Sequence, residues 1–152
     1  KTNRHKSPGW DFCVIIACVK KKQAAGKDFK VVRAAKGAGL GLVALRPFRK
    51  GEFIIEYVGI KKKNKDVEFD TTKYLFDLDD KFTIDGSPRS NTARYINHSC
   101  APNAESEIVR GRILISAIKP IQPGDEITYD YGKEYFDEFL GKDCRCNKCA
   151  AR

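Results

Sequence analysis

This chain of 152 residues has few histidines and lacks long apolar runs and internal repeats. It has two histidines, and because His5 lies in a polar stretch, His98 has no second histidine with which to form a conventional catalytic zinc site. A serine-hydrolase triad has equally little support. No apolar run approaches the roughly 20 residues of a membrane span, and residues 14–19 are too few even for the core of a signal peptide. We therefore expect a soluble intracellular protein that does not bind a membrane.

Composition and charge predict one globular domain with an acidic partner. A chain of 152 residues buries roughly 70% of its unfolded surface, enough for one real core. Hydrophobic residues make up 41% of the chain and aromatic residues 11%, and the net charge is +9. Clustered Lys and Arg favour phosphate or other acidic groups. The lysine runs at residues 20–22 and 61–63 are also typical of solvated turns, so any nucleic-acid contact is expected to be non-specific.

Most of the chain reads as short strands separated by Gly and Pro. Apolar and β-branched residues predict strands over residues 12–20, 29–33, 53–58, 74–78, 82–84, 112–118 and 126–129. Helical turns are predicted only over residues 90–96 and 134–140. The sequence therefore predicts a mostly β fold with few short helices.

Two stretches carry chemical groups that a packed core does not require. Residues 94–100 read Arg-Tyr-Ile-Asn-His-Ser-Cys, and residues 124–132 read Gly-Asp-Glu-Ile-Thr-Tyr-Asp-Tyr-Gly. They are preceded, in order, by Gly39-Leu40-Gly41, Glu56-Tyr57-Val58-Gly59, Tyr74-Leu75-Phe76 and Ile84-Asp85. This ordered set resembles the SET-domain protein-lysine methyltransferases. The chain departs from the family pattern at Ser90, where Gly is usual, and at Tyr95, where Phe is usual.

The resemblance implies a fold and a division of the chain. SET domains have a β-clip fold of several small curved sheets and a C-terminal pseudoknot, in which the last segment passes through a loop formed earlier. The division expected here is an N-terminal flanking segment over residues 1–28, a SET domain over 29–133 and a post-SET zinc-binding tail over 134–152. The Cys-rich pre-SET cluster of some relatives has no counterpart in residues 1–27.

The resemblance also implies S-adenosylmethionine as the methyl donor. Taken alone, a Gly-x-Gly segment is a tight turn and a single His is structural. In this family, glycines let the backbone approach the donor, and the Asn-His pair holds it through backbone and side-chain hydrogen bonds. The predicted cofactor-binding residues are Gly39, Leu40, Gly41, Tyr74, Asn97, His98, Tyr135 and Phe136, the last two as covers of the adenine ring.

Three tyrosines are the predicted catalytic residues, because in this family such tyrosines line a narrow channel for the substrate lysine. Methyl transfer needs a neutral amine, and deprotonating a lysine of pKa about 10.4 at neutral pH costs roughly 4 kcal/mol. An apolar channel lowers that cost. Tyr131 is expected to face the transferring methyl, Tyr57 to orient the amine, and Tyr129 to hold the amine or a water. The Tyr129 hydroxyl predicts mainly monomethylation, with some dimethylation.

The six cysteines divide into two groups. Cys144, Cys146 and Cys149 have metal-ligand spacing, and together with Cys100 they can form one structural zinc site of four thiolates. The resemblance implies the same post-SET site, although the family tail usually has four residues between its second and third Cys and this one has two. A disulfide in the tail is the alternative, which an intracellular compartment disfavours. Cys13 and Cys18 are interpreted as buried apolar residues.

Substrate and compartment follow less directly. The resemblance implies a peptide or protein lysine, with a histone tail as one candidate, in a nuclear, chromatin-associated or cytoplasmic setting. Acidic stretches at residues 66–70 and 77–80 could receive a basic peptide. Two other classes stay open, a catalytically silent SET-like module that binds peptide or nucleic acid, and a small zinc-containing nucleic-acid-binding protein. The sequence does not indicate an oligomeric state.

Overall fold

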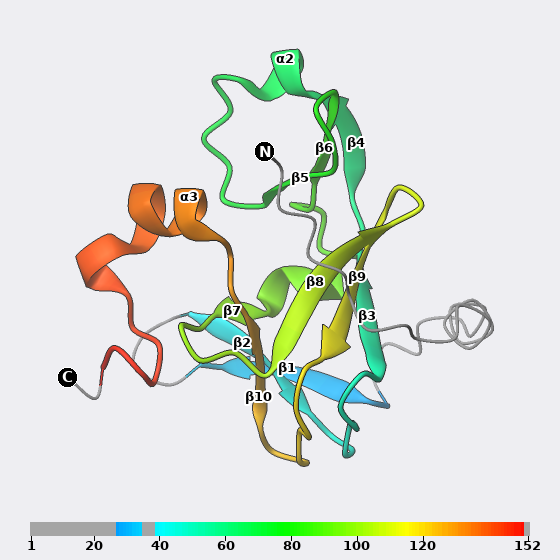
Figure 1. The fold of residues 1–152 in the computed structure, drawn as a ribbon, viewed down its shortest axis with the longest axis vertical. Helices are drawn as coiled ribbons and strands as arrows, with labels where there is room; N and C mark the ends of the chain where they lie inside the picture. Colours follow the sequence, from blue (N-terminus) through cyan, green and yellow to red (C-terminus); the bar gives the residue numbers. More distant parts are fainter. Residues whose placement is uncertain (1–26, 35–38, 151–152) are drawn as a thin grey trace, which may run out of the picture.

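The strands of the computed structural model, which describes residues 27–34 and 39–150, form three small sheets (Figure 1). The first has the order β1 (Phe29–Arg33), β2 (Leu40–Ala44), β10 (Glu126–Tyr129) and β7 (Asn97–His98). The second has the order β3 (Phe53–Tyr57), β9 (Arg112–Ala117) and β8 (Ala104–Val109). The third has the order β4 (Ile60–Lys63), β6 (Phe82–Asp85) and β5 (Leu75–Asp77). All pairings are antiparallel except β10 with β7, which is parallel.

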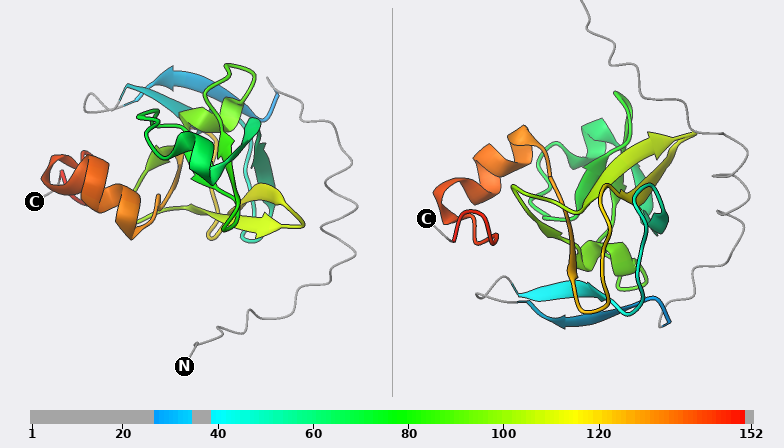
Figure 2. Two further views of the ribbon diagram at one scale, coloured as in Figure 1. Left: turned by 90° about the horizontal axis from the view of Figure 1, so that it is seen from above. Right: turned by 60° about the horizontal axis from the view of Figure 1, so that its bottom comes forward.

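Helical segments in the described residues are short and lie between strands or in the tail. They are α2 (Asn64–Val67), the 3₁₀ helix η2 (Thr92–Tyr95), α3 (Lys133–Tyr135), the π-helical turn η3 (Phe136–Leu140) and the 3₁₀ helix η4 (Gly141–Asp143). None of them has the length and apolar character that crossing a bilayer would require. In Figures 1 and 2, α3 and the turns that follow it lie to one side of the three sheets.

Buried aliphatic side chains join the first two sheets into one core. Leu42 of β2 and Ile127 of β10 are fully buried, and Ile113 and Ile115 of β9 lie in the same cluster. Ile96, just before β7, completes it. Burial of each such side chain contributes roughly 1.5–3 kcal/mol, so these strands are held by packing as well as by their ladders.

The last strand, β10, lies against the segment that contains the Asn-His-Ser-Cys motif. Ser99 N–H donates to the Tyr129 carbonyl at 3.0 Å, and Asn103 N–H donates to the Thr128 carbonyl at 3.2 Å. The Asn103 side chain accepts from Thr128 N–H and donates to the Glu126 carbonyl, both at 2.8 Å. We call this contact between residues 96–103 and 126–131 the crossing. It lies where the family resemblance predicts the pseudoknot.

Six predicted strands agree with the structure. β1 and β10 have the predicted limits, β3, β6 and β9 differ from the prediction by one residue at one end, and β5 is one residue shorter at each end. The predicted helical turns contain η2, η3 and part of α3. The predicted strand over residues 12–20, together with Cys13 and Cys18, lies outside the described residues. The mostly β fold class predicted from the sequence is confirmed.

Four strands were missed, each for a local reason. Gly39 and Gly41, before and within β2, resemble a turn, and β7 has only two residues. The alternating acidic residues of β8 hide its strand pattern. The run Lys61–Lys63, expected to be a solvated turn, lies in β4 instead. There Lys62 forms ion pairs with Asp70 and Asp85, which compensates for the weak strand preference of lysine.

Candidate active site

A cavity of about 920 Å³ lies between the crossing, the insert after β4 and the tail. Its walls come from segments far apart in the sequence. The predicted site residues that line it are Gly39, Leu40, Tyr57, Tyr74, Asn97, Tyr129, Tyr131 and Tyr135. Gly41, His98 and Phe136 belong to the same region but do not line the cavity itself. The cavity therefore unites the predicted cofactor residues with the predicted catalytic tyrosines.

Two glycines near one end of this cavity, Gly39 and Gly41, are each required by the local structure. A Cβ on Gly41 would lie 2.5 Å from the Glu126 carboxylate and 3.2 Å from the Asn97 amide nitrogen. The Asn97 amide donates to Glu126 Oε1 at 2.8 Å and to the Leu40 carbonyl at 3.0 Å. Gly39 has a φ of +82°, a conformation that favours glycine. Gly41 thus makes room for the Asn97–Glu126 hydrogen bond, which fixes the cavity wall.

Two tyrosine hydroxyls at the other end already donate their hydrogens to the backbone. Tyr57 donates to the Tyr74 carbonyl at 2.8 Å, and Tyr131 donates to the Ile96 carbonyl at 2.7 Å. Each phenol oxygen is therefore left with lone pairs and can only accept a further hydrogen bond. Gly86 packs against Tyr57 so closely that a Cβ there would lie 2.3 Å from the Tyr57 hydroxyl. The position of that hydroxyl is fixed from both sides.

Burial keeps these phenols protonated. It raises the pKa of Tyr57, Tyr129 and Tyr131 above the usual value of about 10. None of the three can serve as a base at neutral pH. Unlike its two neighbours, the Tyr129 hydroxyl donates to no described residue. It is free to donate a hydrogen bond into the cavity.

A continuous series of aromatic rings forms the apolar surface of the cavity. Tyr57 contacts Phe76 with ring centroids 5.4 Å apart, and Tyr129 contacts Tyr131 at 4.9 Å. Phe76 links the two pairs through Tyr129, at 6.4 Å. Such rings exclude water and stabilise the neutral form of an amine placed among them.

The tail supplies the outer wall of the cavity. Tyr135 packs edge-on against Tyr131 at 5.0 Å, and its hydroxyl donates to the Lys73 carbonyl at 3.4 Å. The Phe139 ring packs at a tilt against Tyr135, with centroids 4.7 Å apart, and lines the cavity. Phe136 instead packs against the His98 ring at 5.4 Å. Its role as an adenine cover stays a prediction, with Phe139 as the aromatic that reaches the cavity.

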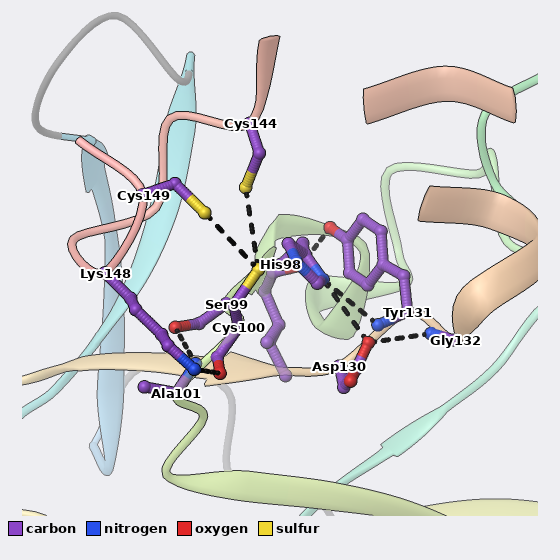
Figure 3. A network of polar contacts seen from close by, with 11 residues as sticks. His98, Ser99, Cys100, Ala101, Asp130, Tyr131, Gly132, Cys144, Lys148 and Cys149 are labelled. Atoms are coloured by element: carbon purple, nitrogen blue, oxygen red, sulfur yellow. Dashed lines mark hydrogen bonds and ion pairs between the residues drawn. The ribbon is translucent and has the colours of Figure 1, made fainter. Parts of the chain in front are cut away.

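His98 is buried behind this wall, with a side chain only 5% exposed. Its Nδ1 accepts from Tyr131 N–H at 3.3 Å, and its Nε2 lies 3.2 Å from Cys100 Sγ (Figure 3). Burial lowers the pKa of His98 in spite of the opposing charge of Asp130. Both ring nitrogens are engaged inside the protein, so only the backbone of His98 is free to contact a cofactor.

The four cysteines of the predicted zinc site gather in one place. Their sulfur atoms all lie within 4.8 Å of one another, with Cys149 at 3.6 Å and Cys144 at 4.0 Å from Cys100. A tetrahedral zinc with Zn–S bonds of about 2.3 Å spaces its sulfurs about 3.8 Å apart. These four residues therefore fit a tetrahedral ion, even with the shortened spacing between Cys146 and Cys149.

Thiol acidity in this cluster is uneven. Burial and neighbouring thiols raise the pKa of Cys100 to about 12. Burial opposes ionisation of Cys146 too, but hydrogen bonds from the Cys100 and Cys149 backbone lower its pKa to about 6. Four crowded sulfurs of which one favours the thiolate are the donor set that a soft divalent cation requires.

Several residues around the cavity were not predicted from the sequence. Arg94 stacks on the Tyr74 ring with 4.0 Å from Cζ to the ring centroid, and Asn103 ties the crossing together. Phe139 could have been found, because it lies four residues after Tyr135 and shares a helix face with it. Arg94 and Asn103 depend on contacts between distant segments, which no local pattern indicates.

Comparison with known protein families supports the resemblance found in the sequence. The family model described as SET domain matches residues 39–132, which is more than half of the chain. The chain belongs to the SET-domain family. The motif order that suggested this family is thereby confirmed, and so is the family fold.

Relatives and solved structures agree with this assignment. The histone-lysine N-methyltransferase trithorax of Drosophila virilis is 35% identical over 135 residues, which cover 81% of this chain and 4% of that protein. The histone-lysine N-methyltransferase ASHH3 of Arabidopsis thaliana is 35% identical over 139 residues, which cover 83% of this chain and 38% of that protein. The structure of ctPRC2 in an autoinhibited conformation bound to S-adenosylmethionine has a TM-score of 0.63 at 30% identity and covers 71% of this chain and 15% of that one. This SET-domain chain thus spans less than half the length of these relatives.

Proposed function

We propose that this chain transfers a methyl group from S-adenosylmethionine to the side-chain nitrogen of a lysine in a protein. The observation that supports this most strongly is a single cavity lined by Gly39 and Asn97, by the buried phenols of Tyr57 and Tyr129 and by the half-buried phenol of Tyr131. SET-domain relatives named as histone-lysine N-methyltransferases support the same activity. The proposed limits are a SET domain over residues 29–133 and a zinc-binding tail over 134–152.

Gly39, Leu40 and Asn97 are the residues proposed to hold the methyl donor. The glycine leaves backbone groups accessible, and the Asn97 amide is already oriented by Leu40 and Glu126. Tyr74, Tyr135 and the backbone of His98 complete the proposed site. When bound, S-adenosylmethionine supplies an electrophilic methyl group and a sulfonium charge. The tail aromatic rings would exclude water from its adenine end.

Three tyrosine side chains would position the lysine. The oxygens of Tyr57 and Tyr131 have given their hydrogens to backbone carbonyls, so they accept from the N–H groups of the amine. The Tyr129 hydroxyl would hold a water by donating to it, or hold the amine by accepting from an N–H group, because the amine lone pair must stay directed at the methyl group. The surrounding rings favour the neutral amine, and fixed geometry can lower a barrier by several kcal/mol.

A basic protein segment is the proposed substrate. Glu68 and Asp77 line the cavity on the insert side, where they would attract the positive charge that flanks a methylated lysine in a basic tail. A histone tail is the first candidate, because the named relatives act on histones. A chromatin-associated location in the nucleus would follow from that substrate.

The test is mass spectrometry of core histones and a peptide array after incubation with the protein and S-adenosylmethionine. A lysine that gains one methyl group identifies both the reaction and the substrate. Tyr131→Phe removes the oriented oxygen and should lower the rate by about 10²-fold. Calorimetry with S-adenosylmethionine is the parallel measurement.

The outcomes separate enzyme from binding module. Donor binding without transfer to any histone or peptide would contradict the histone substrate. Absence of both transfer and donor binding would contradict the proposed activity and favour a silent peptide-binding module.

A further inference from the structure

One imidazole joins the cysteine cluster to the catalytic tyrosine. His98 Nε2 lies 3.2 Å from Cys100 Sγ, and His98 Nδ1 accepts from the backbone N–H of Tyr131 at 3.3 Å. Figure 3 shows the ring between these two groups, with Cys144 and Cys149 beyond Cys100. Phe136 covers one side of the ring at 5.4 Å. The imidazole is thus fixed by contacts to both the crossing and the tail.

The hydrogen bond from Tyr131 decides where the imidazole carries its proton. A neutral imidazole has one donor nitrogen and one acceptor nitrogen. Since Tyr131 N–H points at Nδ1, that nitrogen holds the lone pair and the hydrogen lies on Nε2, directed at Cys100 Sγ. Asp130 does not alter this, because its Oδ1 is 3.7 Å from Nδ1 and accepts instead from Gly132 N–H at 3.0 Å.

We propose that His98 is a positioning residue that couples the metal site of the tail to the segment of Tyr131, so that metal and methyl donor strengthen each other's binding. Its Nε2–H donates to the Cys100 thiolate, and its Nδ1 holds the Tyr131 backbone. The metal half of this proposal depends only on the fit of four sulfurs to a tetrahedral ion. The donor half rests on the proposed function.

Two physical effects set the expected changes in zinc affinity and in the coupling between zinc and methyl donor. A hydrogen bond to a metal-bound thiolate disperses negative charge and fixes the ligand, and such outer contacts change metal affinity by about 10–100-fold. A shared element that both ligands order makes their affinities interdependent, by about 5–150-fold in typical cases, and the factor is the same in both directions. In this chain the shared element is the imidazole together with the rings of Tyr131 and Phe136, which pack on it.

Two substitutions separate the two ends of the imidazole. Asn in place of His98 keeps a side-chain acceptor near Nδ1 for Tyr131 N–H, but it cannot reach Cys100. Gln in place of His98 can place an amide N–H near Nε2 for Cys100, but it leaves Tyr131 N–H without its acceptor. Each variant therefore serves as the control for the other, and both change the same position.

The experiment measures the zinc dissociation constant of the full chain by competition with a chromophoric chelator, with and without saturating S-adenosylhomocysteine. We expect S-adenosylhomocysteine, the product left after methyl transfer, to tighten zinc binding at least about 5-fold in the unmodified protein. His98→Asn should weaken zinc binding about 10–100-fold, and His98→Gln should stay near the unmodified value. Both variants should lose most of the dependence on S-adenosylhomocysteine.

Cobalt substitution gives a second readout that does not depend on cofactor or activity. Loss of the hydrogen bond to Cys100 raises the energy of the sulfur electrons, so the sulfur-to-cobalt charge-transfer band of His98→Asn should move to longer wavelength. The band of His98→Gln should not move. If His98→Asn does not fold, as judged by circular dichroism, the Gln variant still tests the coupling.

Three results would overturn the proposal. The first is a His98→Asn protein that binds zinc as tightly as the unmodified chain with an unmoved cobalt band. The second is a coupling factor unchanged in His98→Gln. The third is normal binding of S-adenosylhomocysteine without any effect on zinc affinity. Failure of the unmodified chain to bind S-adenosylhomocysteine at all would instead contradict the proposed function, and the metal half would still be decided by the chelator and cobalt data.

Discussion

The crossing and the tail form opposite walls of the same cavity, but different forces hold them. At the crossing, Ile96 and Ile127 are fully buried and Asn103 makes two side-chain hydrogen bonds to β10. In the tail, α3, η3 and η4 contain no buried residue. The tail is attached through the cysteine cluster and a few aromatic contacts. Packing and hydrogen bonds can therefore form the crossing without a ligand, whereas the tail needs a ligand to order it.

Removal of the metal should have the largest effect on this difference. Structural zinc sites contribute on the order of 10 kcal/mol to the folding of small zinc domains, and the tail has no core to replace that contribution. We expect a chelator to abolish hydrogen-exchange protection over residues 133–150 while β2, β9 and β10 keep theirs. The measurement is hydrogen exchange followed by mass spectrometry, with and without chelator.

Cys149→Ser should reproduce the effect of the chelator, because it removes one of the four sulfurs. Equal protection of the tail with and without metal would show that aromatic contacts suffice. The tail would then, like the crossing, be ordered without a metal ion.

The matching test of the crossing is Asn103→Ala. The substitution leaves Thr128 N–H and the Glu126 carbonyl without their partners, which should lower the free energy of unfolding by about 2–4 kcal/mol. Asn147→Ala in the tail is the control, because Asn147 is exposed and surface substitutions usually change stability by less than about 0.5 kcal/mol. Urea unfolding measures both. Similar values for the two variants would contradict the view that the crossing is the stabilising region.

The sequence predicts some parts of the two walls well, namely the strands and the residues of the family motifs. The limits of β1 and β10 are predicted to the residue because both segments are rich in the β-branched and aromatic residues that favour strands. The ordered motifs identified the family, and they brought Asn97, Tyr131 and the tail cysteines into one proposed site. Local pattern and family resemblance are thus sufficient where a residue has one role.

What the sequence could not predict depends on distant partners. The Gly41 position is explained by Glu126, which lies 85 positions later, and the side-chain role of His98 is set by Cys100 and Tyr131. The resemblance predicts that Asn97 and His98 hold the cofactor through backbone and side-chain hydrogen bonds, but it does not indicate that both ring nitrogens of His98 contact other groups of the protein. Only the threaded arrangement of the crossing brings these groups together.

The insert sheet, β4-β6-β5, forms a third wall of the cavity, and an ion pair between Lys62 and Asp85 helps to hold it. Although burial alone would raise the pKa of Asp85, Lys62 at 2.8 Å and hydrogen bonds from Ser87 lower it to about 2. Because the folded pKa is below the unfolded value of about 3.9, the pair stabilises the fold above pH 4. That stabilisation is lost as the pH falls from about 4 towards 2.

Lys62→Met should therefore lower the urea midpoint at pH 7 and leave it nearly unchanged near pH 2. We expect a smaller effect than that of Asn103→Ala, because the Lys62 side chain is 31% exposed. Urea titrations across this pH range provide the measurement. A difference between the two proteins that does not depend on pH would mean that Lys62 acts through packing on the sheet and not through its charge.

Of these substitutions, Tyr129→Phe should have the smallest effect on stability, but it should change the methylation state of the product. The substitution removes one hydroxyl that donates to no described residue, so the fold and the first methyl transfer should be nearly unaffected. The amine or water held by that hydroxyl would be released, and a monomethylated lysine would gain room to rotate and react again. The ratio of dimethyl- and trimethyl-lysine to monomethyl-lysine, measured by mass spectrometry at equal turnover, should rise. Mostly trimethyl-lysine from the unmodified protein, or an unchanged ratio in the variant, would mean that the Tyr129 hydroxyl does not limit the product, and that Tyr57 and Tyr131 alone define the space around the amine.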